Sequence, residues 1–204
     1  HGETEWNKEE IFRGQIDVPL NENGRLQAKL AAQRLRDQKI QAIYTSPLSR
    51  AEETARAIGK VHDITPLREP AFTDLNFGQW QGLSHHQVRA SYPELYRQWK
   101  NTPHLVTFPR GENLAAVSQR AMSALWEITA RHEEDESIAI VTHRVVAKII
   151  ILGILGLSNE SFWKIRQDTC AINGFELAGP NTYHVLFLND TCHLREASTV
   201  RADF

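Results

Sequence analysis

A short apolar run that ends in a histidine is the feature that most restricts how this chain can fold. Residues 138–142 read Ile-Ala-Ile-Val-Thr and precede His143, after which residues 145–157 are largely apolar. The first run predicts a buried strand, and the second predicts a buried helix that is too short to span a bilayer. In an α/β fold, a histidine at such a junction points over the carboxyl edge of a parallel sheet, where these proteins bind ligands.

A second histidine, His1, is followed by Gly-Glu-Thr, and we interpret it as another strand-to-helix junction. One of the two histidines can attack a substrate, while the other donates a hydrogen bond or carries charge. Two arginines, Arg13 and Arg50, lie in segments that can reach the same sheet edge. Together these residues suit the binding of a phosphate ester.

The rest of the chain alternates between strand-like and helix-like segments. Strands are expected at 40–45, 64–67 and 137–142, and helices at 21–37, 46–59, 84–100 (broken before Pro93), 112–132 and from 144. Residues 170–177 and 183–189 predict an antiparallel hairpin. This order predicts a three-layer α/β sandwich with a mostly parallel central sheet, helices on both faces and an antiparallel edge.

The length of 204 residues indicates a single domain that spans residues 1–204. Residues 68–111 form the one long segment with an irregular pattern and no clear strand. Excursions of this kind often build a lid or the wall of a pocket, so we expect this segment to border the site.

Composition excludes several classes of partner and cofactor. The formal net charge is -2, with no basic footprint for nucleic acid, and no apolar segment is long enough to suggest a membrane partner. Neither an HExxH nor a CxxC pattern is present, and adjacent His85 and His86 face different directions on a helix, so we expect no bound metal. His85 and His86 are instead expected to be solvated helix residues. Cys170 and Cys192 are expected to be small buried residues in a reduced, cytoplasmic compartment.

Five motifs occur in a characteristic order. They are HGETEWN at 1–7, PLNENG at 19–24, YTSPLSRA at 44–51, NFGQWQG at 76–82 and VTH at 141–143. In order and spacing these motifs resemble the histidine phosphatase superfamily, which is also called phosphoglycerate-mutase-like, over essentially the whole chain.

The resemblance implies a role for each matching residue. His1 would be the nucleophile that becomes phosphorylated, and His143 would donate to the phosphate oxygens beside it. Arg50 would offer a fork of N–H donors, Asn7 a neutral donor, and the helix after His143 its N-terminal dipole. No metal or other cofactor is implied, because arginines and imidazole supply the positive charge.

The proton donor to the leaving group is less closely matched. Relatives commonly carry a Glu a few residues before the Phe-Gly turn, and the matching residue here is Asp74, which is one methylene shorter. Asp74 is therefore the expected acid, with Glu69 and Glu112 as alternatives. A role for Asp74 as a turn former or helix cap is the other interpretation.

Three further residues are candidate substrate ligands that depart from the family pattern or lie outside its core motifs. Arg13 and Arg144 stand where relatives often have smaller residues, and each would contact phosphate or the rest of the substrate, or else serve a surface contact or structural ion pair. His193, in a Thr-Cys-His-Leu ending similar to that of some phosphoserine-phosphatase-like members, would approach the site rim or be structural. Relatives also carry a strand ending in Arg before the nucleophile, so we expect that several N-terminal residues precede His1.

The resemblance implies a phosphomonoesterase that acts on a small phosphorylated metabolite through a phosphohistidine. Cofactor-dependent mutases carry an insertion with paired arginines, and residues 84–110 contain no Arg-Arg pair, which favours the phosphatase. A mutase, or a phosphoester-binding module with impaired catalysis, are the alternatives. A homodimer is an expectation at the level of the family.

Overall fold

A parallel sheet with strand order β2-β1-β3 lies at the centre of the computed structural model, which describes residues 1–195 and 197. The strands are β1 (Ile40–Thr45), β2 (Leu67–Arg68) and β3 (Ser137–Val141), and both neighbouring pairs are parallel. The strand expected at 64–67 begins three residues later than predicted, at Leu67. Ile64 instead donates its N–H to the carbonyl of Gly59, and Pro66 has no N–H to donate to a ladder.

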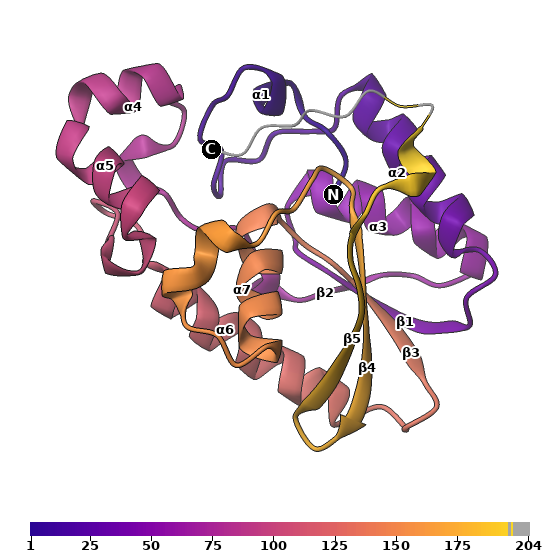
Figure 1. The fold of residues 1–204 in the computed structure, drawn as a ribbon. Helices are drawn as coiled ribbons and strands as arrows, with labels where there is room; N and C mark the ends of the chain where they lie inside the picture. Colours follow the sequence, from indigo (N-terminus) through magenta and orange to yellow (C-terminus); the bar gives the residue numbers. More distant parts are fainter. Residues whose placement is uncertain (196, 198–204) are drawn as a thin grey trace.

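Helices cover both faces of this sheet, as the sequence predicts (Figure 1). On one face lie α2 (Glu22–Leu35) and α3 (Ser49–His62), and on the other lie α6 (Leu114–Thr129) and α7 (Arg144–Ile154). Alternation along the strands explains this layering, because neighbouring side chains point to opposite faces. Ile43 and Val141 pack in the core with α3, whereas Tyr44 packs in the core of α6 and α7.

The start of α3 differs from the expected position at Ser46-Pro47. Ser46 donates its N–H to the carbonyl of Val141 and so continues the sheet ladder, which prevents it from starting the helix. The helix begins three residues later at Ser49, where Asp17 Oδ1 accepts the backbone N–H at 2.8 Å. By contrast, Asn21 caps α2 as expected, and its side chain accepts from Gly24.

The irregular segment 68–111 consists of short helices. They are η1 (Pro70–Phe72), η2 (Gly78–Trp80), α4 (His85–Ser91), α5 (Pro93–Asn101) and η3 (Pro103–Leu105). Trp80, Trp99 and Phe108 are buried and pack edge to face, which holds these helices together despite their poor periodicity.

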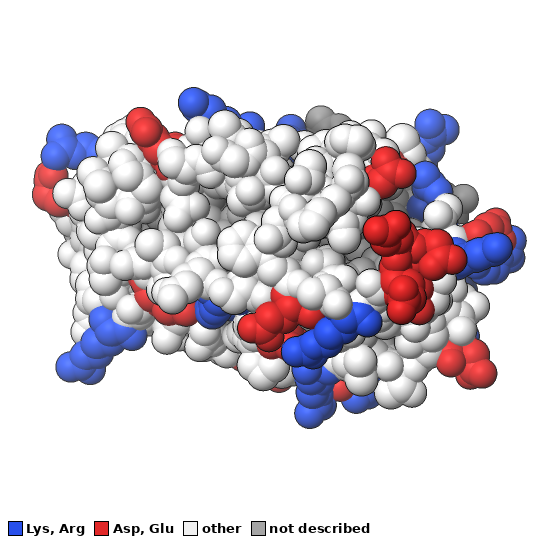
Figure 2. Space-filling view, turned by 90° about the horizontal axis from the view of Figure 1, so that it is seen from below, with Lys and Arg blue, Asp and Glu red and all other residues white. Residues whose placement is uncertain are grey.

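The expected hairpin is present as β4 (Ile172–Gly179) and β5 (Thr182–Asp190), which pair as a two-stranded antiparallel sheet of their own. Seen from the hairpin end of the molecule, the surface has broad uncharged areas with Lys, Arg, Asp and Glu mainly around them (Figure 2). Leu177, Val185, Leu186 and Phe187 of the hairpin are exposed. Shorter elements complete the description, namely α1 (Glu5–Lys8), η4 (Asn159–Lys164) and η5 (Cys192–Leu194).

The two cysteines differ in environment. Cys170 is buried and Cys192 is exposed, and both are free thiols. The expectation that both are buried is therefore wrong for Cys192, because its short helix η5 follows β5 at the surface. Within residues 1–195 and 197, no helix is long and apolar enough to cross a membrane.

Candidate active site

The two histidines meet at the carboxyl edge of the sheet. His143 follows β3 and is the N-cap residue of α7, and it is 1% exposed. The backbone nitrogen of His1 donates to the carbonyl of Thr142 at 3.2 Å, and the His1 carbonyl accepts from the backbone N–H of Cys170. These contacts bring the imidazole rings together edge to face, with centroids 5.0 Å apart.

The hydrogen bond of the His1 ring determines which nitrogen is nucleophilic. Nδ1 lies 2.7 Å from the carbonyl oxygen of Gly2. A carbonyl oxygen can only accept, so Nδ1 carries the proton. In the neutral ring the lone pair is then on Nε2, the nitrogen that a phosphohistidine would use.

His143 is held as a neutral imidazole. Its Nε2 lies 2.7 Å from Ser46 Oγ, and its Nδ1 lies 3.8 Å from Asp74 Oδ2. Burial lowers the pKa of His143 well below its usual range, and the nearby Arg50 guanidinium lowers it further. His143 is therefore uncharged near pH 7 and able to donate one hydrogen bond.

Arg50, near the N-terminus of α3, is fully buried beside Asp74. Its Nη1 and Nη2 donate to the carbonyls of Ile16 and Gly14 at 3.0 and 2.7 Å, and Nη2 lies 3.4 Å from Asp74 Oδ2. Burial lowers the pKa of Arg50, which the charge of Asp74 opposes. The guanidinium therefore positions the loop that carries Arg13.

Several buried nitrogens in this region have no hydrogen-bond partner. They include Nε of Arg13, Nε of Arg50 and Nδ1 of His143. Burial, followed by the charge of Arg50, lowers the pKa of Arg13 to about 9, which still leaves it cationic at pH 7. Buried donors are almost always satisfied in proteins, so unsatisfied donors grouped in this way fit an anion such as phosphate.

Asp74 is the carboxyl group that the structure brings to this group of cations. It is 5% exposed, and its Oδ1 accepts the backbone N–H of Leu75. Burial raises the pKa of Asp74, while Arg50 and Arg13 oppose the increase. A carboxyl group with a raised pKa is suited to donate a proton.

The two alternative acids are engaged elsewhere. Glu69 caps η1 through the N–H of Ala71, and Glu112 pairs with Arg120 at 3.0 Å. Arg120 also donates to the carbonyl of Asp74 and so positions the loop of the candidate acid. Sequence reasoning missed this role, because Arg120 lies in a long helix that was interpreted only by its amphipathic pattern.

The remaining candidates differ in their placement. Asn7 is buried, and its Oδ1 accepts from the backbone N–H of Thr4, so its NH₂ group is the end that can donate to an anion. Arg144 lines a pocket with Arg13 and Asp74. His193 contacts the segment next to His1, since its Nε2 is 3.2 Å from the carbonyl of Cys170 and Cys170 donates its N–H to the carbonyl of His1.

The pocket extends from Asp74 into the segment 68–111 and is open to solvent. Phe77, His85 and Trp99 of that segment line it. The expectation that His85 is solvated is wrong, because its ring stacks on Phe12 with centroids 4.1 Å apart. Burial lowers the pKa of His85 to about 4.

Two other lining or supporting residues were not predicted as functional. Ser46, in the YTSPLSRA motif, binds His143, and its motif position was the available signal. Lys148 lines the pocket from α7, but a single Lys within an apolar helix gave no signal of its own. In the described part of the chain, no cluster of three or more His, Cys, Asp or Glu residues is arranged to hold a metal ion.

The parallel sheet with two histidines and buried arginines at its carboxyl edge defines an α/β protein with a candidate site for an anion. Residues 1–191 match the histidine phosphatase superfamily (branch 1), and the chain belongs to that family. It is 34% identical over 196 residues to phosphoserine phosphatase 1 of Hydrogenobacter thermophilus, covering 96% of this chain and 92% of that protein. It is 32% identical over 208 residues to phosphoglycerate mutase-like protein 4 of Arabidopsis thaliana, covering 100% of this chain and 88% of the relative.

A solved structure agrees in fold. Bacillus stearothermophilus YhfR superposes with a TM-score of 0.91 at 33% identity, covering 96% of each chain. The resemblance inferred from the five motifs is thereby confirmed at the level of the family. Named relatives include phosphatases and phosphoglycerate mutases, so both activities occur among proteins similar to this chain.

Proposed function

We propose that this chain is a phosphomonoesterase that hydrolyses a small phosphorylated metabolite through a phosphohistidine on His1. The observation that carries the proposal is the orientation of the His1 ring beside His143. Nδ1–H of His1 is held by the carbonyl of Gly2, which leaves the Nε2 lone pair for attack. His143 and the grouped arginine nitrogens supply donors to the phosphate oxygens.

The reaction proceeds in two steps, phosphoryl transfer to His1 and hydrolysis of the phosphohistidine. His1 Nε2 forms a bond to phosphorus while the bond to the ester oxygen breaks, and that oxygen takes the proton of Asp74. Water then attacks the phosphohistidine, and the Asp74 carboxylate takes a proton from it, so inorganic phosphate leaves and His1 is regenerated. Arg13, Arg50 and His143 stabilise the three equatorial oxygens in both steps, with Asn7 as a further donor.

Similarity to a protein named phosphoserine phosphatase supports hydrolysis as the outcome. A phosphoglycerate mutase is the second candidate, because a relative at 32% identity bears a mutase-like name. The two functions share the first step and differ in whether water or a bound phosphoglycerate accepts the phosphoryl group. The absence of an Arg-Arg pair from residues 84–110 favours water as the acceptor.

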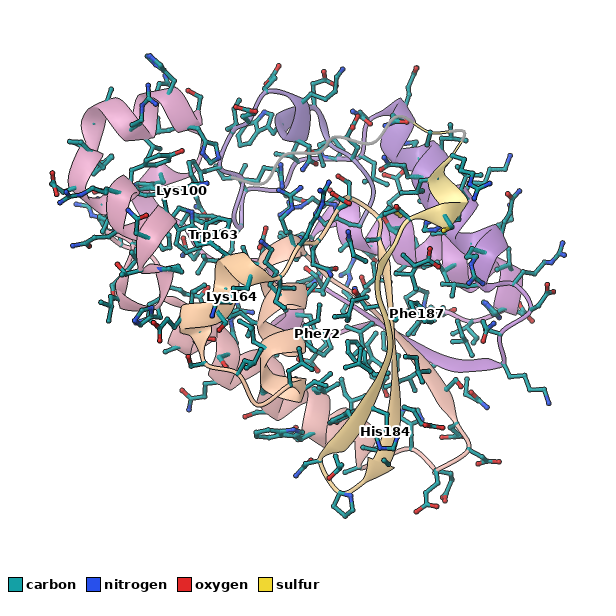
Figure 3. All side chains as sticks on the ribbon, viewed as in Figure 1. Phe72, Lys100, Trp163, Lys164, His184 and Phe187 are labelled. Atoms are coloured by element: carbon teal, nitrogen blue, oxygen red, sulfur yellow. The ribbon has the colours of Figure 1, made fainter. Side chains whose placement is uncertain are left out.

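The test is phosphate release from p-nitrophenyl phosphate, O-phosphoserine and 3-phosphoglycerate by the parent protein and by His1→Ala. We expect turnover by the parent, and an acid-labile phosphate on the parent but not on His1→Ala. His184→Ala changes an exposed histidine on the hairpin (Figure 3) and is expected to behave like the parent. Interconversion of 3- and 2-phosphoglycerate that requires 2,3-bisphosphoglycerate would favour the mutase, and no turnover of any ester would contradict both enzymatic functions.

A further inference from the structure

The pocket beside Asp74 continues along helix α7 as a cationic wall. Arg144 and Lys148 both line it, with Val145 between them. Residues four apart lie on the same helix face, and their Cα atoms are separated by about 6 Å along the axis. Arg144 directly follows His143, so Lys148 lies one helical turn further from the candidate phosphate site.

Lys148 is unusual because it is a buried cation within an apolar helix. Lys148 is 1% exposed, and its Nζ lies 4.9 Å from the ring centroid of Phe162 and 4.7 Å from that of Trp163. An ammonium group loses much of its hydration on burial, and aromatic faces compensate for part of that loss. Lys148 therefore keeps its ammonium group beside two aromatic faces at the wall of the pocket.

A second ammonium group, that of the exposed Lys100, lies near the Trp163 ring but is not among the described residues that line the pocket. Lys100 of α5 places its Nζ 4.6 Å from the ring centroid of Trp163, and the two side chains lie together between α5 and η4 (Figure 3). The Trp163 indole is fixed by donation from Nε1 to the carbonyl of Trp99 at 2.6 Å. The Trp163 ring is therefore fixed in position beside Lys148.

The charges that border the pocket are predominantly positive. Arg13, Arg144 and Lys148 line it together with a single carboxyl group, that of Asp74. The pKa of His85 is lowered to about 4, first by burial and then by Lys100, Arg144 and Arg13, so His85 is neutral at pH 7. Helix α7 therefore adds two cations, Arg144 and Lys148, to the Arg13 side of the pocket.

We propose that Lys148, together with Arg144, is a specificity-determining residue that binds a second anionic group of the substrate. This inference rests on the proposed phosphomonoesterase function. The second anion is a carboxylate joined to the phosphoester by a short carbon chain, since the two ends of the site are about one helical turn apart. A single ammonium group packed against Phe162 and Trp163 suits one carboxylate better than a second phosphoryl group with three oxygens.

The test compares esters that differ only in the carboxylate. O-Phosphoserine is paired with phosphoethanolamine, and 3-phosphoglycerate with 2-hydroxyethyl phosphate. We expect Lys148→Met to lower kcat/KM for the two carboxylated esters about tenfold or more, mainly through KM, because a hydrogen bond to a charged group is lost. The values for the two esters without a carboxylate and for p-nitrophenyl phosphate stay within about twofold of the parent.

Two variants serve as controls. Lys164→Met removes an exposed lysine next to Trp163 and is expected to leave all five substrates unchanged. Lys148→Arg keeps the charge and is expected to retain most of the preference for carboxylated esters. Circular dichroism of each variant establishes that the fold is intact before kinetics are compared.

The outcomes separate this inference from the proposed function. Equal loss on all five substrates by folded Lys148→Met, or no loss on any, would overturn the role of Lys148 while leaving phosphatase activity established. Hydrolysis of none of the five esters by the parent protein would overturn both proposals. A selective loss on the carboxylated pair, recovered by Lys148→Arg, supports the inference.

Discussion

The imidazole rings of His1 and His143 meet edge to face, with centroids 5.0 Å apart and an interplanar angle of 62°. The two residues are 142 positions apart in the chain, and each ring is oriented by a different hydrogen bond. Gly2 holds Nδ1 of His1, whereas Ser46 holds Nε2 of His143. The pair therefore offers one nitrogen lone pair and one donor to the same small volume, which underlies the predictions that follow.

Arg50→Met is predicted to lower kcat/KM by about 10²- to 10³-fold, the range seen when a preorganised donor to a developing anion is removed. The variant also loses the hydrogen bonds to the carbonyls of Gly14 and Ile16, which position the loop that carries Arg13. Inorganic phosphate should therefore bind the variant, and inhibit it, more weakly. Steady-state kinetics and phosphate inhibition provide the measurement. Arg56→Met, an exposed arginine on the same helix, is the matched control, and an equal effect of both variants would contradict the role of Arg50.

Asp74→Asn tests whether the buried carboxyl group is the proton donor. The amide cannot protonate a leaving alkoxide, so turnover of alkyl phosphates should fall by about 10²- to 10⁴-fold. p-Nitrophenyl phosphate has a good leaving group that needs little protonation, and its turnover should fall much less.

The measurement for Asp74→Asn is kcat on both ester types, with Asp63→Asn as control. Asp63 is exposed and has φ 55°, a backbone conformation that Asn tolerates. Equal losses on alkyl and aryl esters would argue that Asp74 positions Arg50 rather than donating a proton.

Gly24→Ala is predicted to disturb the site because Gly24, a buried residue of helix α2, packs against the backbone of Glu3. A Cβ at Gly24 would lie 2.0 Å from the carbonyl oxygen of Glu3, and neither backbone can yield easily. Overpacking of this kind costs about 1–3 kcal/mol, and it displaces the segment that carries His1. Urea unfolding and kcat together provide the measurement, with Lys29→Ala at an exposed position of the same helix as control. Unchanged stability and activity would show that the close approach has no role.

His85 is predicted to make the protein less stable in acid. Its pKa is about 4 in the folded state, against 6.5 as the ordinary value, so the unfolded chain binds more protons between these pH values. Stability that is present above pH 6.5 is therefore lost as the pH falls toward 4. After allowance for the partial solvent exposure of His85, the free energy of unfolding at pH 5 is lower than at pH 7 by about 1 kcal/mol.

The pH prediction is checked by urea unfolding at pH 7, 6 and 5. His85→Phe preserves stacking on Phe12 but loses the contact with Tyr96, so it should be slightly less stable than the parent at pH 7. The difference should shrink or reverse at pH 5. His86→Phe adds the same ring at an exposed neighbour, and a parallel decline of the parent and His85→Phe would exclude the buried imidazole as the cause.

The elements with regular periodicity were predictable from the sequence. Alternation and β-branched residues indicate the strands near 40–45 and 137–142, and the spacing of apolar residues indicates α2 and α6. Prediction failed where long-range hydrogen bonds decide the boundary. Ser46 continues the sheet because the carbonyl of Val141 accepts its N–H, and no local signal at 46 reports that partner.

The sequence by itself determined the family, the order of strands and helices, and the residue types available for phosphate chemistry, because these follow from local patterns and motif order. Only the tertiary structure decided the electrostatic state of the site. The neutrality of His143 and the raised pKa of Asp74 come from burial, which depends on the packing of distant segments. The same packing places Lys148 in the pocket wall, since the contacts of one lysine in an apolar helix are decided by which elements cover that helix.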